Sequence, residues 1–422
     1  MDPFMTIAIL LGLTAVFAFL NERFFRLQTA IGLLLLALIM TLVLAGLQSL
    51  GTINYLGWEK ALVQRLDLST TLLNGVLCFM LFAGSCSVQM QFLREQKWII
   101  LSLAIGSTLL ACLLIGVGLW YALGVFGVTL SLTYALIFGA LISPTDPIVA
   151  LAILGRVGLP KPLESIMSGE SLFNDGVGVV LFTMGLTIAL GAEKQTVTDA
   201  VGLFLREVLG GIGLGLVVSV LMHSLLMHTT EYGNQLLIAF ATVTLGYGMA
   251  EQIEVSGPIA MVVAGLAIGN VSLPRLASEV RQPFETFWHG IDEILNALLF
   301  VIIGLDVVML HYLPGTHFGI SMACAILLCL LARGISVYVP VAVLSATPAL
   351  HADCWGVTRL LTWGGLRGGL ALAMALSLPA GPDKTLVVNM TYGVVVFSIL
   401  VQGLTIGRFF KPDYLQGLLK SG

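Results

Sequence analysis

The chain has 422 residues, of which 58% are hydrophobic and 10% are charged. Because an ordinary soluble domain carries roughly 25% charged residues, this composition excludes a soluble enzyme and predicts an all-α polytopic membrane protein with no soluble domain. The formal net charge is −4, from 19 Lys and Arg against 23 Asp and Glu, and the chain has no basic run. The chain therefore lacks the basic surface that binding to a nucleic acid requires, and the lipid bilayer is its expected surrounding.

Thirteen apolar segments follow one another when the chain is divided at polar, charged and Gly/Pro clusters. Since a spanning helix takes about 20 apolar residues, we expect about 13 transmembrane helices in a single membrane transport domain, 1–422. No basic residue precedes the first segment, which is expected to be a membrane helix and not a removed signal peptide. The predicted spans are 5–20, 28–49, 70–88, 98–123, 129–153, 163–190, 200–227, 233–252, 256–272, 284–310, 317–346, 356–378 and 385–408.

The loops between these spans differ in their content of basic residues. Eleven Lys and Arg fall in one set of alternate loops and four in the other, and the remaining four lie in or at the ends of spans. The positive-inside rule therefore places the C-terminus in the cytoplasm and the N-terminus outside. The richer set is Arg23, Arg26, Arg94, Lys97, Arg156, Lys161, Arg275, Arg281, Arg408, Lys411 and Lys420, and the poorer set is Lys60, Arg65, Lys194 and Lys384.

The fifth and twelfth predicted spans are interrupted, at 143–147 (SPTDP) and at 364–369 (GGLRGG). Pro lacks the N–H that an interior helical position needs, and Gly weakens a helix through its conformational freedom. Because the two spans are seven apart, they run in opposite directions through the membrane. This arrangement predicts approximate inverted repeats, 5–190 and 233–408, with a linker helix at 200–227 and two broken helices crossing at the midplane.

The sixth predicted span carries a polar face. At about 100° per residue, Ser171, Asn174, Asp175 and Gly178 fall on one side of a helix. Hydroxyl, amide and carboxylate oxygens are hard donors of the kind that an alkali cation prefers, and the absence of His and Cys argues against a transition metal. We therefore expect Asp175 to bind a transported ion or proton, because a charged residue in mid-membrane is costly unless it has a function or a partner.

The fifth span is expected to complete this site. Its two prolines remove N–H donors and free carbonyls of the preceding turn, so the carbonyls near Ser143 and Thr145 are candidate cation ligands. Asp146 stands where a new half-helix begins and would compensate its positive end. Arg367 is expected to do the same for a negative half-helix end in the twelfth span.

Other charged residues of the spans receive structural interpretations. Glu170 and Arg367 are predicted to form a buried structural ion pair, since removing one partner of such a pair typically costs about 3–5 kcal/mol. Asp292 and Glu293 lie early in the tenth span, and Arg333 lies late in the eleventh, so the three are expected near the cytoplasmic face. An ion pair and a pH-sensing cluster both fit these positions.

Four segments of the chain together resemble the NhaP-type sodium/proton antiporters of the monovalent cation:proton antiporter-1 family. They are GALISPTDPIVALAIL (139–154), GRVGLPKPLESIMSGESLFNDGVGVVLF (155–182), DEILNALLFVIIGLDV (292–307) and TWGGLRGGLALAMALSLP (362–379). The resemblance covers nearly the whole chain in order and spacing. It implies that Asp175 carries the cation and the proton with Asn174 as its partner, and that Asp175, Ser171 and the Thr145 backbone bind Na⁺.

The resemblance also implies that Asp146 is the acid of the broken helix. It further implies that Glu170 and Arg367 form a stabilising ion pair. Many relatives carry an acid in the third span within a pattern like L-F-E, where this chain has LFAG at 81–84, so a ligand from that helix is absent. The family forms dimers, which makes a homodimer the expected assembly. The short chain favours a bacterial inner membrane.

The expected function is secondary active transport that exchanges Na⁺, Li⁺ or K⁺ for protons by alternating access, with a role in pH homeostasis and no bound cofactor. Cation and proton would compete for Asp175, and the neutral neighbour Asn174 predicts one proton per cation with no net charge moved. A cation channel or a Na⁺-coupled symporter is the alternative, although no carbonyl-rich filter string or polar substrate cluster is present. An intramembrane aspartyl protease using Asp146 and Asp175 is disfavoured, because the chain has no G-x-G-D string.

Overall fold

The computed structural model describes residues 3–50, 75–190, 197–306, 316–345 and 353–418. Within these ranges the chain is almost entirely helical, and the one pairing of strand type is an isolated bridge between Asp146 and Leu366. Nine helices in the described ranges are long and apolar enough to cross a membrane. The predicted all-α membrane fold is therefore confirmed, whereas the number of thirteen spans stays a prediction.

The helices of the first half of the chain flank one interrupted span. They are α1 Pro3–Leu20, α2 Thr29–Ser49, α5 Leu77–Cys86, α6 Met90–Glu95, α7 Lys97–Leu101, α8 Thr108–Val125, α9 Leu132–Ile142, α10 Ile148–Val157 and α11 Lys161–Ala189. A π-helical segment, Ser102–Ser107, makes α7 and α8 continuous.

The second half contains the other interrupted span and ends near the C-terminus. Its helices are α12 Val197–Met227, α13 Tyr232–Gln252, α14 Gly257–Ala267, α15 Ser278–Asp306, α16 Thr316–Ser345, α17 Cys354–Gly364, α18 Gly369–Ser377, α19 Pro382–Phe397, α20 Gly403–Phe409 and α21 Pro412–Gly417. A second π-helical segment, Ser398–Gln402, joins α19 to α20.

Each predicted span overlaps a helix or a pair of helices in the described ranges. The predicted spans 70–88, 284–310 and 317–346 each extend at one end into residues outside those ranges. Lys60, Arg65, Lys194 and Lys420, which entered the count of basic loops, also lie outside them.

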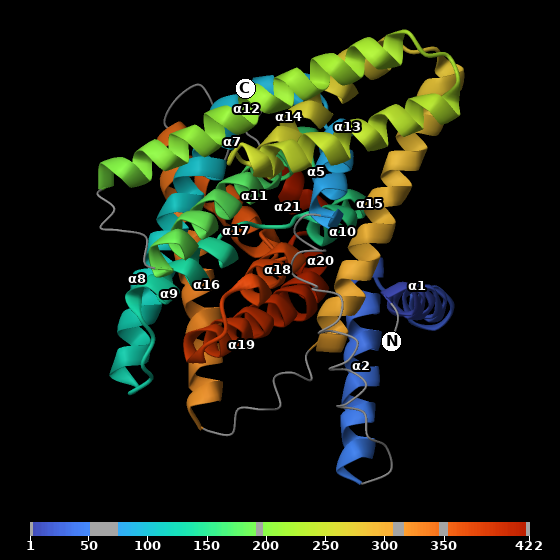
Figure 1. Cartoon of the computed structure of the whole chain (residues 1–422). Coiled ribbons are helices and arrows are strands. Elements are labelled where there is room, and N and C mark those ends of the chain that lie inside the picture. Colours follow the sequence, from blue (N-terminus) through green and yellow to red (C-terminus); the bar gives the residue numbers. More distant parts are fainter. Residues whose placement is uncertain (1–2, 51–74, 191–196, 307–315, 346–352, 419–422) are drawn as a thin grey trace.

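The helix α11 packs on helices from both halves of the chain. It contacts α9, α12, α14 and the π-helical segment before α8. In Figure 1 the long helix α12 lies across one end of the molecule beside α14, and α15 runs beside α2. Small residues bring some of these backbones close, since a Cβ built on Gly139 of α9 would lie 2.3 Å from the Cys112 carbonyl oxygen of α8. The buried residues of α11 lie between Leu163 and Phe182.

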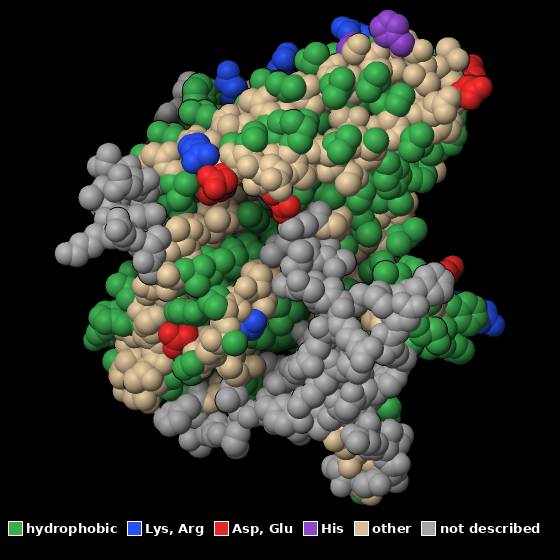
Figure 2. Space-filling model, in the orientation of Figure 1, with side chains coloured by type: hydrophobic (Ala, Val, Ile, Leu, Met, Phe, Trp, Pro, Cys, Tyr) green, Lys and Arg blue, Asp and Glu red, His purple; other side chains and the backbone are tan. Residues whose placement is uncertain are grey.

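The outer surface is that of a protein in lipid. Large apolar side chains are exposed along α12 and α13, including Val217, Val220, Leu237 and Leu245, each at least 65% exposed. Figure 2 shows hydrophobic side chains spread widely over the described part of one face, with few charged groups among them. Soluble monomers rarely expose contiguous apolar patches of this extent, so the bundle is a multi-pass membrane protein.

Local capping explains where the interrupted helices begin. The Ser131 hydroxyl accepts a hydrogen bond from the Tyr134 N–H at the start of α9, at 3.3 Å. The Asp353 carboxylate accepts from the Trp355 and Gly356 N–H groups at the start of α17, at 3.3 and 3.1 Å. Such side-chain caps satisfy N–H groups that have no partner within the helix. They fix the first turns of both helices.

Candidate ion-binding site

The two predicted interruptions are present, and they lie side by side. One runs between α9 and α10, and the other between α17 and α18. The Asp146 N–H donates a hydrogen bond of 2.8 Å to the Leu366 carbonyl, which makes the antiparallel bridge between the two segments. Non-helical backbone at membrane depth is tolerated only where protein buries it or water lines it, so paired breaks mark a cavity or a buried joint.

Two arginines lie at the carboxyl ends of the half-helices. Arg367 donates from Nη1 to the Ser143 carbonyl and, at 2.7 Å, to the Pro144 carbonyl, just past the end of α9. Arg333 donates from Nη2 to the Leu361 carbonyl near the end of α17, at 3.3 Å. The carboxyl end of a helix carries partial negative charge, which these guanidinium groups compensate. The sequence had suggested that Arg367 compensates a half-helix end of its own span, the twelfth. It instead compensates the end of α9, in the fifth span.

The Asp146 carboxylate lies near the amino ends of the half-helices α10 and α18. Asp146 Oδ1 accepts a hydrogen bond of 2.9 Å from the Ile148 N–H, at the first turn of α10. A Cβ built on Gly368 would lie 2.6 Å from Asp146 Oδ2, so this carboxylate also packs against the backbone that leads into α18. Negative charge is favourable at both positions. Gly368 is needed here because any side chain would displace the carboxylate.

The polar face of α11 meets this joint. Asn174 donates from Nδ2 to the Thr145 hydroxyl at 3.0 Å, and its own buried Oδ1 has no hydrogen-bond partner among the described residues. Ser171 is 8% exposed and lies on the same side of α11 as Asp175. An orphaned buried carbonyl oxygen is unfavourable unless a ligand or water satisfies it. The helix therefore presents a carboxylate, a hydroxyl and a free amide oxygen around the break.

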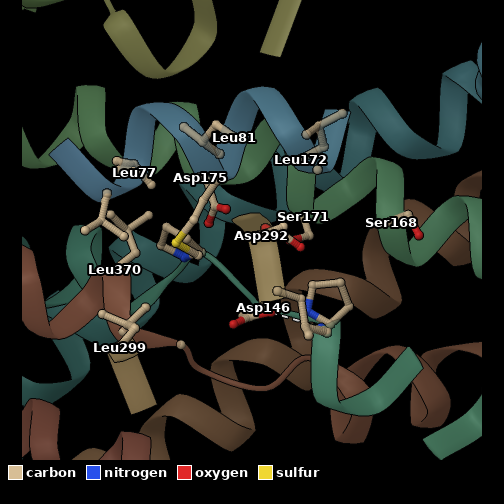
Figure 3. Close-up of a pocket in the computed structure, with 18 of the residues that line it drawn as sticks. Leu77, Leu81, Asp146, Ser168, Ser171, Leu172, Asp175, Asp292, Leu299 and Leu370 are labelled. Atoms are coloured by element: carbon tan, nitrogen blue, oxygen red, sulfur yellow. Dashed lines mark hydrogen bonds between the residues drawn. The ribbon is translucent and has the colours of Figure 1, made fainter. Parts of the chain in front are cut away.

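A cavity of about 260 Å³ adjoins this face of α11. Asp175 of α11, Asp146 of the first break and Asp292 of α15 all line it, together with Ser171, and Figure 3 shows their side chains around one space. Its remaining wall is largely apolar and includes Leu77 and Leu81 of α5. Three carboxylates from three different elements, set in an apolar wall, make this cavity the candidate site for a small cation or for protons.

A comparison with known families decides the class of the protein. The family described as "Sodium/hydrogen exchanger, transmembrane" matches residues 8–411. This chain belongs to that family.

Individual relatives of this exchanger span its whole length. The chain is 40% identical over 412 residues to the Na⁺/H⁺ antiporter NhaP of Pseudomonas aeruginosa, covering 97% of this chain and 96% of the relative. It is 33% identical over 388 residues to the Na⁺/H⁺ antiporter NhaH of Halobacillus dabanensis, covering 89% and 91%. The structure of the sodium proton antiporter MjNhaP1 from Methanocaldococcus jannaschii at pH 8 matches with a TM-score of 0.76 at 19% identity over both whole chains, which shows a shared fold.

The predicted ion pair between Glu170 and Arg367 is wrong in its arginine. Glu170 of α11 pairs with Arg333 of α16, at 2.5 Å between Oε1 and Nη1, and not with Arg367. Both side chains are almost fully buried, with 4% of Arg333 and 2% of Glu170 exposed. The reason is topological, because Arg367 lies on the second break and reaches the end of α9, while α16 packs on the segment that precedes α8, beside α11.

The predicted cluster of Asp292, Glu293 and Arg333 is not formed. α15 packs mainly on α2 and α5, while α16 packs mainly on α8 and α17, so these charges lie on separate helix groups. Asp292 accepts from Asn296 Nδ2 at 3.1 Å, and Glu293 lies 3.5 Å from His289 Nε2. The place of Asp292 beside the ion cavity was missed. Asp292 and Leu299 stand two turns apart on one helical face, and both line the cavity.

The Ser143 carbonyl was a predicted cation ligand and is instead an acceptor for Arg367. The Ser143 hydroxyl donates to the Gly139 carbonyl, at 2.5 Å, and is also engaged. The Thr145 hydroxyl accepts a hydrogen bond from Asn174.

A second cavity of about 440 Å³ adjoins the first in this exchanger. The two share Ser87, Val88 and Asp292 as lining residues. The second also contains Arg281, Glu285 and His289 of the amino-terminal half of α15. Asp292 therefore lies between the acidic cavity and a second cavity at the amino-terminal half of α15.

Replacing Gly178 with alanine is expected to slow ion exchange about tenfold or more. A Cβ on Gly178 would lie 2.0 Å from Pro144 Cγ, so the added methyl group must push the break away from α11. Overpacking of this kind costs about 1–3 kcal/mol, and 1.4 kcal/mol corresponds to about tenfold. The measurement is cation-driven dissipation of a pH gradient in proteoliposomes.

Gly213→Ala on α12 is the matched control, since a Cβ there meets nothing within 4 Å. Equal rates for the two variants would show that close packing of α11 on Pro144 does not matter for exchange.

Proposed function

We propose that this chain is a secondary active transporter that exchanges a monovalent alkali cation, chiefly Na⁺, for a proton, and is not an enzyme. The observation that carries the proposal is the position of Asp175, which lines one cavity together with Asp146 beside two interrupted helices. Relatives named Na⁺/H⁺ antiporters, matched over nearly their full length, support Na⁺ as the cation. The proposed mechanism uses the transported ions and includes no bound cofactor.

The cation ligands would be the Asp175 carboxylate, the Ser171 hydroxyl and the Thr145 carbonyl. The Asn174 Oδ1, buried and without a partner among the described residues, supplies one further oxygen donor in reach of the same break. All four are hard donors, which suits an alkali cation better than a transition metal. Asp146 contributes negative charge nearby while it compensates the start of α10.

Exchange follows from competition at this site. A proton on Asp175 removes the charge that holds the cation, and a bound cation excludes the proton, so the carboxylate carries one or the other. If the site changes sides only when it is loaded, the two fluxes are coupled. With Asn174 neutral, one titrating carboxylate gives one proton per cation and electroneutral transport. Asp146 and Asp292 are the rival titrating groups because they line the same cavity.

Alternating access would move the broken helices with α11 as a unit. The Asp146 to Leu366 hydrogen bond and the Arg367 contacts with the Ser143 and Pro144 carbonyls tie the two breaks together. We place this unit within inverted repeats, 5–190 and 233–408, with 200–227 as the linker helix between them. Rigid movement of such a unit against the remaining helices exposes a fixed site to each side in turn.

In the cell, the chain would lie in a bacterial inner membrane as a homodimer, with its N-terminus outside and its C-terminus in the cytoplasm. The excess of basic residues in alternate loops supports this orientation. The homodimer rests on the family resemblance. In this orientation the second cavity beside Asp292 opens toward the cytoplasm.

The test is a Na⁺ concentration jump on proteoliposomes adsorbed to a sensor electrode, with a trapped pH dye read in parallel. Electroneutral exchange predicts a pH change in the lumen with no transport current above that of empty vesicles. Moving one charge through the membrane potential is worth about 2.3 kcal/mol per 100 mV, so an electrogenic cycle would give a current that depends on voltage. Such a current would overturn the ratio of one to one, and Na⁺ uptake without proton movement would indicate a channel.

A further inference from the structure

A groove unrelated to the ion cavity lies on the outer surface between α16, α17 and the end of α20. Its volume is about 640 Å³, and it shares no lining residue with the cavity around Asp175. Its walls are mostly apolar or aromatic, and include Leu331, Ile335, Tyr338, Trp355, Trp363 and Phe409. Several of these side chains are half exposed or more, among them Trp355 at 63%.

The groove runs along the half-helix α17. Trp355 lies at its first turn and Trp363 near its end, eight residues apart, which is about 12 Å along a helix. Leu330 and Tyr338 have the same separation on α16. The length and the apolar wall suit an extended acyl chain lying beside two helices.

The aromatic residues mark the level of the membrane interface. The Tyr338 and Trp355 rings contact edge to face, with 6.3 Å between centroids, at the start of α17. Trp and Tyr gather where hydrocarbon meets the headgroups. The break at the other end of α17 lies deeper, since this half-helix leads to the paired segments around Asp146. The groove therefore extends from the headgroup level toward the middle of the bilayer.

One charge lies in this groove. Arg359 is exposed, lines the groove, and has no ion-pair or hydrogen-bond partner among the residues that the structure describes. The buried Arg333 and Arg367 are both partnered, and the Asp353 carboxylate is engaged with N–H groups of α17. A guanidinium on the lipid-facing side of a half-helix is unfavourable without an anion.

The geometry directs this charge toward the headgroups. Arg359 lies four residues after Trp355, about 6 Å deeper along α17. Side chains of a helix tilt toward its amino end, so the guanidinium reaches back to the level of Trp355. Guanidinium groups bind phosphate through two parallel hydrogen bonds. The groove thus offers an apolar channel for a chain and a phosphate-binding group at its outer end.

We propose that this groove binds one anionic glycerophospholipid from the leaflet at the start of α17, with its phosphate on Arg359 and an acyl chain along α16 and α17. Arg359 supplies the charge complementarity, and the Tyr338 and Trp355 pair sets the depth. α17 is the half-helix whose end is held by Arg333, so a lipid seated here contacts an element of the broken pair directly.

The test is native mass spectrometry of the detergent-purified full chain, titrated with phosphatidylglycerol and, separately, with phosphatidylcholine of the same acyl chains. The wild type is expected to keep one phosphatidylglycerol in preference to phosphatidylcholine. Arg359→Gln should weaken phosphatidylglycerol binding about tenfold and abolish this preference. Arg156→Gln, which removes an exposed arginine from the end of α10 outside the groove, is the matched control and should bind as the wild type does.

Ile335→Trp adds a second readout that leaves the arginine in place. It fills the groove and should lower the binding of both lipids. Unchanged phosphatidylglycerol binding by Arg359→Gln, with the variant folded by circular dichroism, would overturn the proposal, and so would equal binding of the two lipids by the wild type. A dimer that Ile335→Trp disrupts while the lipid count stays unchanged would assign the groove to a second copy of the chain.

Discussion

Asp175→Asn is expected to reduce cation-driven proton flux at least about a hundredfold. Asparagine keeps the shape of the side chain but removes the charge and the exchangeable proton at the cavity formed with Asp146 and Asp292. Leaving a buried cation without its charged partner costs about 3–5 kcal/mol, and each 1.4 kcal/mol is about a factor of ten. The measurement is dissipation of an imposed pH gradient in proteoliposomes by Na⁺, Li⁺ and K⁺ in turn.

Asp413→Asn is the control for this variant. Asp413 is an exposed acid in α21, outside the cavity, and its replacement should leave the flux unchanged. Both variants are checked for folding by their thermal melting. If Asp175→Asn still exchanged ions at the wild-type rate, the proton would travel on Asp146 or Asp292, and Asp146→Asn and Asp292→Asn would show which.

The features of the site that depend on neighbouring residues were predictable from the sequence. SPTDP and GGLRGG interrupt their helices because Pro and Gly act on the backbone where they stand, and both breaks are found at those positions. The helical period likewise put Asn174 and Gly178 on one side of α11, and both contact the first break, at Thr145 and at Pro144. These predictions needed no knowledge of the packing between distant helices.

The features that depend on packing were not predictable. Glu170 had two buried arginines as possible partners, and sequence separation does not distinguish them, since Arg333 is 163 residues away and Arg367 is farther still. The structure assigns Arg333 to Glu170 because α16 packs near α11, and it sends Arg367 to the end of α9. The inverted repeats stay a prediction because they depend on the arrangement of whole helices.

The half-helix ends explain why both arginines are needed. Arg367 lies at the carboxyl end of α9 and Arg333 at that of α17, and Lys384 donates to the Leu376 and Leu378 carbonyls at the end of α18, at 2.7 and 2.6 Å. Each broken helix creates ends that carry partial charge inside the membrane. The two arginines act at different half-helix ends, so the fold, and not charge alone, determines which end each one reaches.

Glu170→Gln is expected to lower the free energy of unfolding by about 3–5 kcal/mol, because it leaves the Arg333 guanidinium buried without its counter-charge. The double variant Glu170→Gln with Arg333→Gln should lose less than the sum of the single losses, since neither charge then remains. Chemical denaturation in detergent micelles measures all three. Glu164→Gln on the same helix is the control, as its ion pair with Lys161 is 40% exposed on the Glu164 side and should contribute less than about 1 kcal/mol.

The same cycle with Arg367→Gln decides which arginine stabilises Glu170. The coupling energy between Glu170 and Arg333 should be larger than that between Glu170 and Arg367, because only the first pair shares a direct contact. A larger coupling with Arg367 would mean that Glu170 belongs with the second break, as the sequence alone had suggested. In that case Arg367, at the end of α9, would share its charge with Glu170. Arg333, at the end of α17, would then be the arginine without an acidic partner.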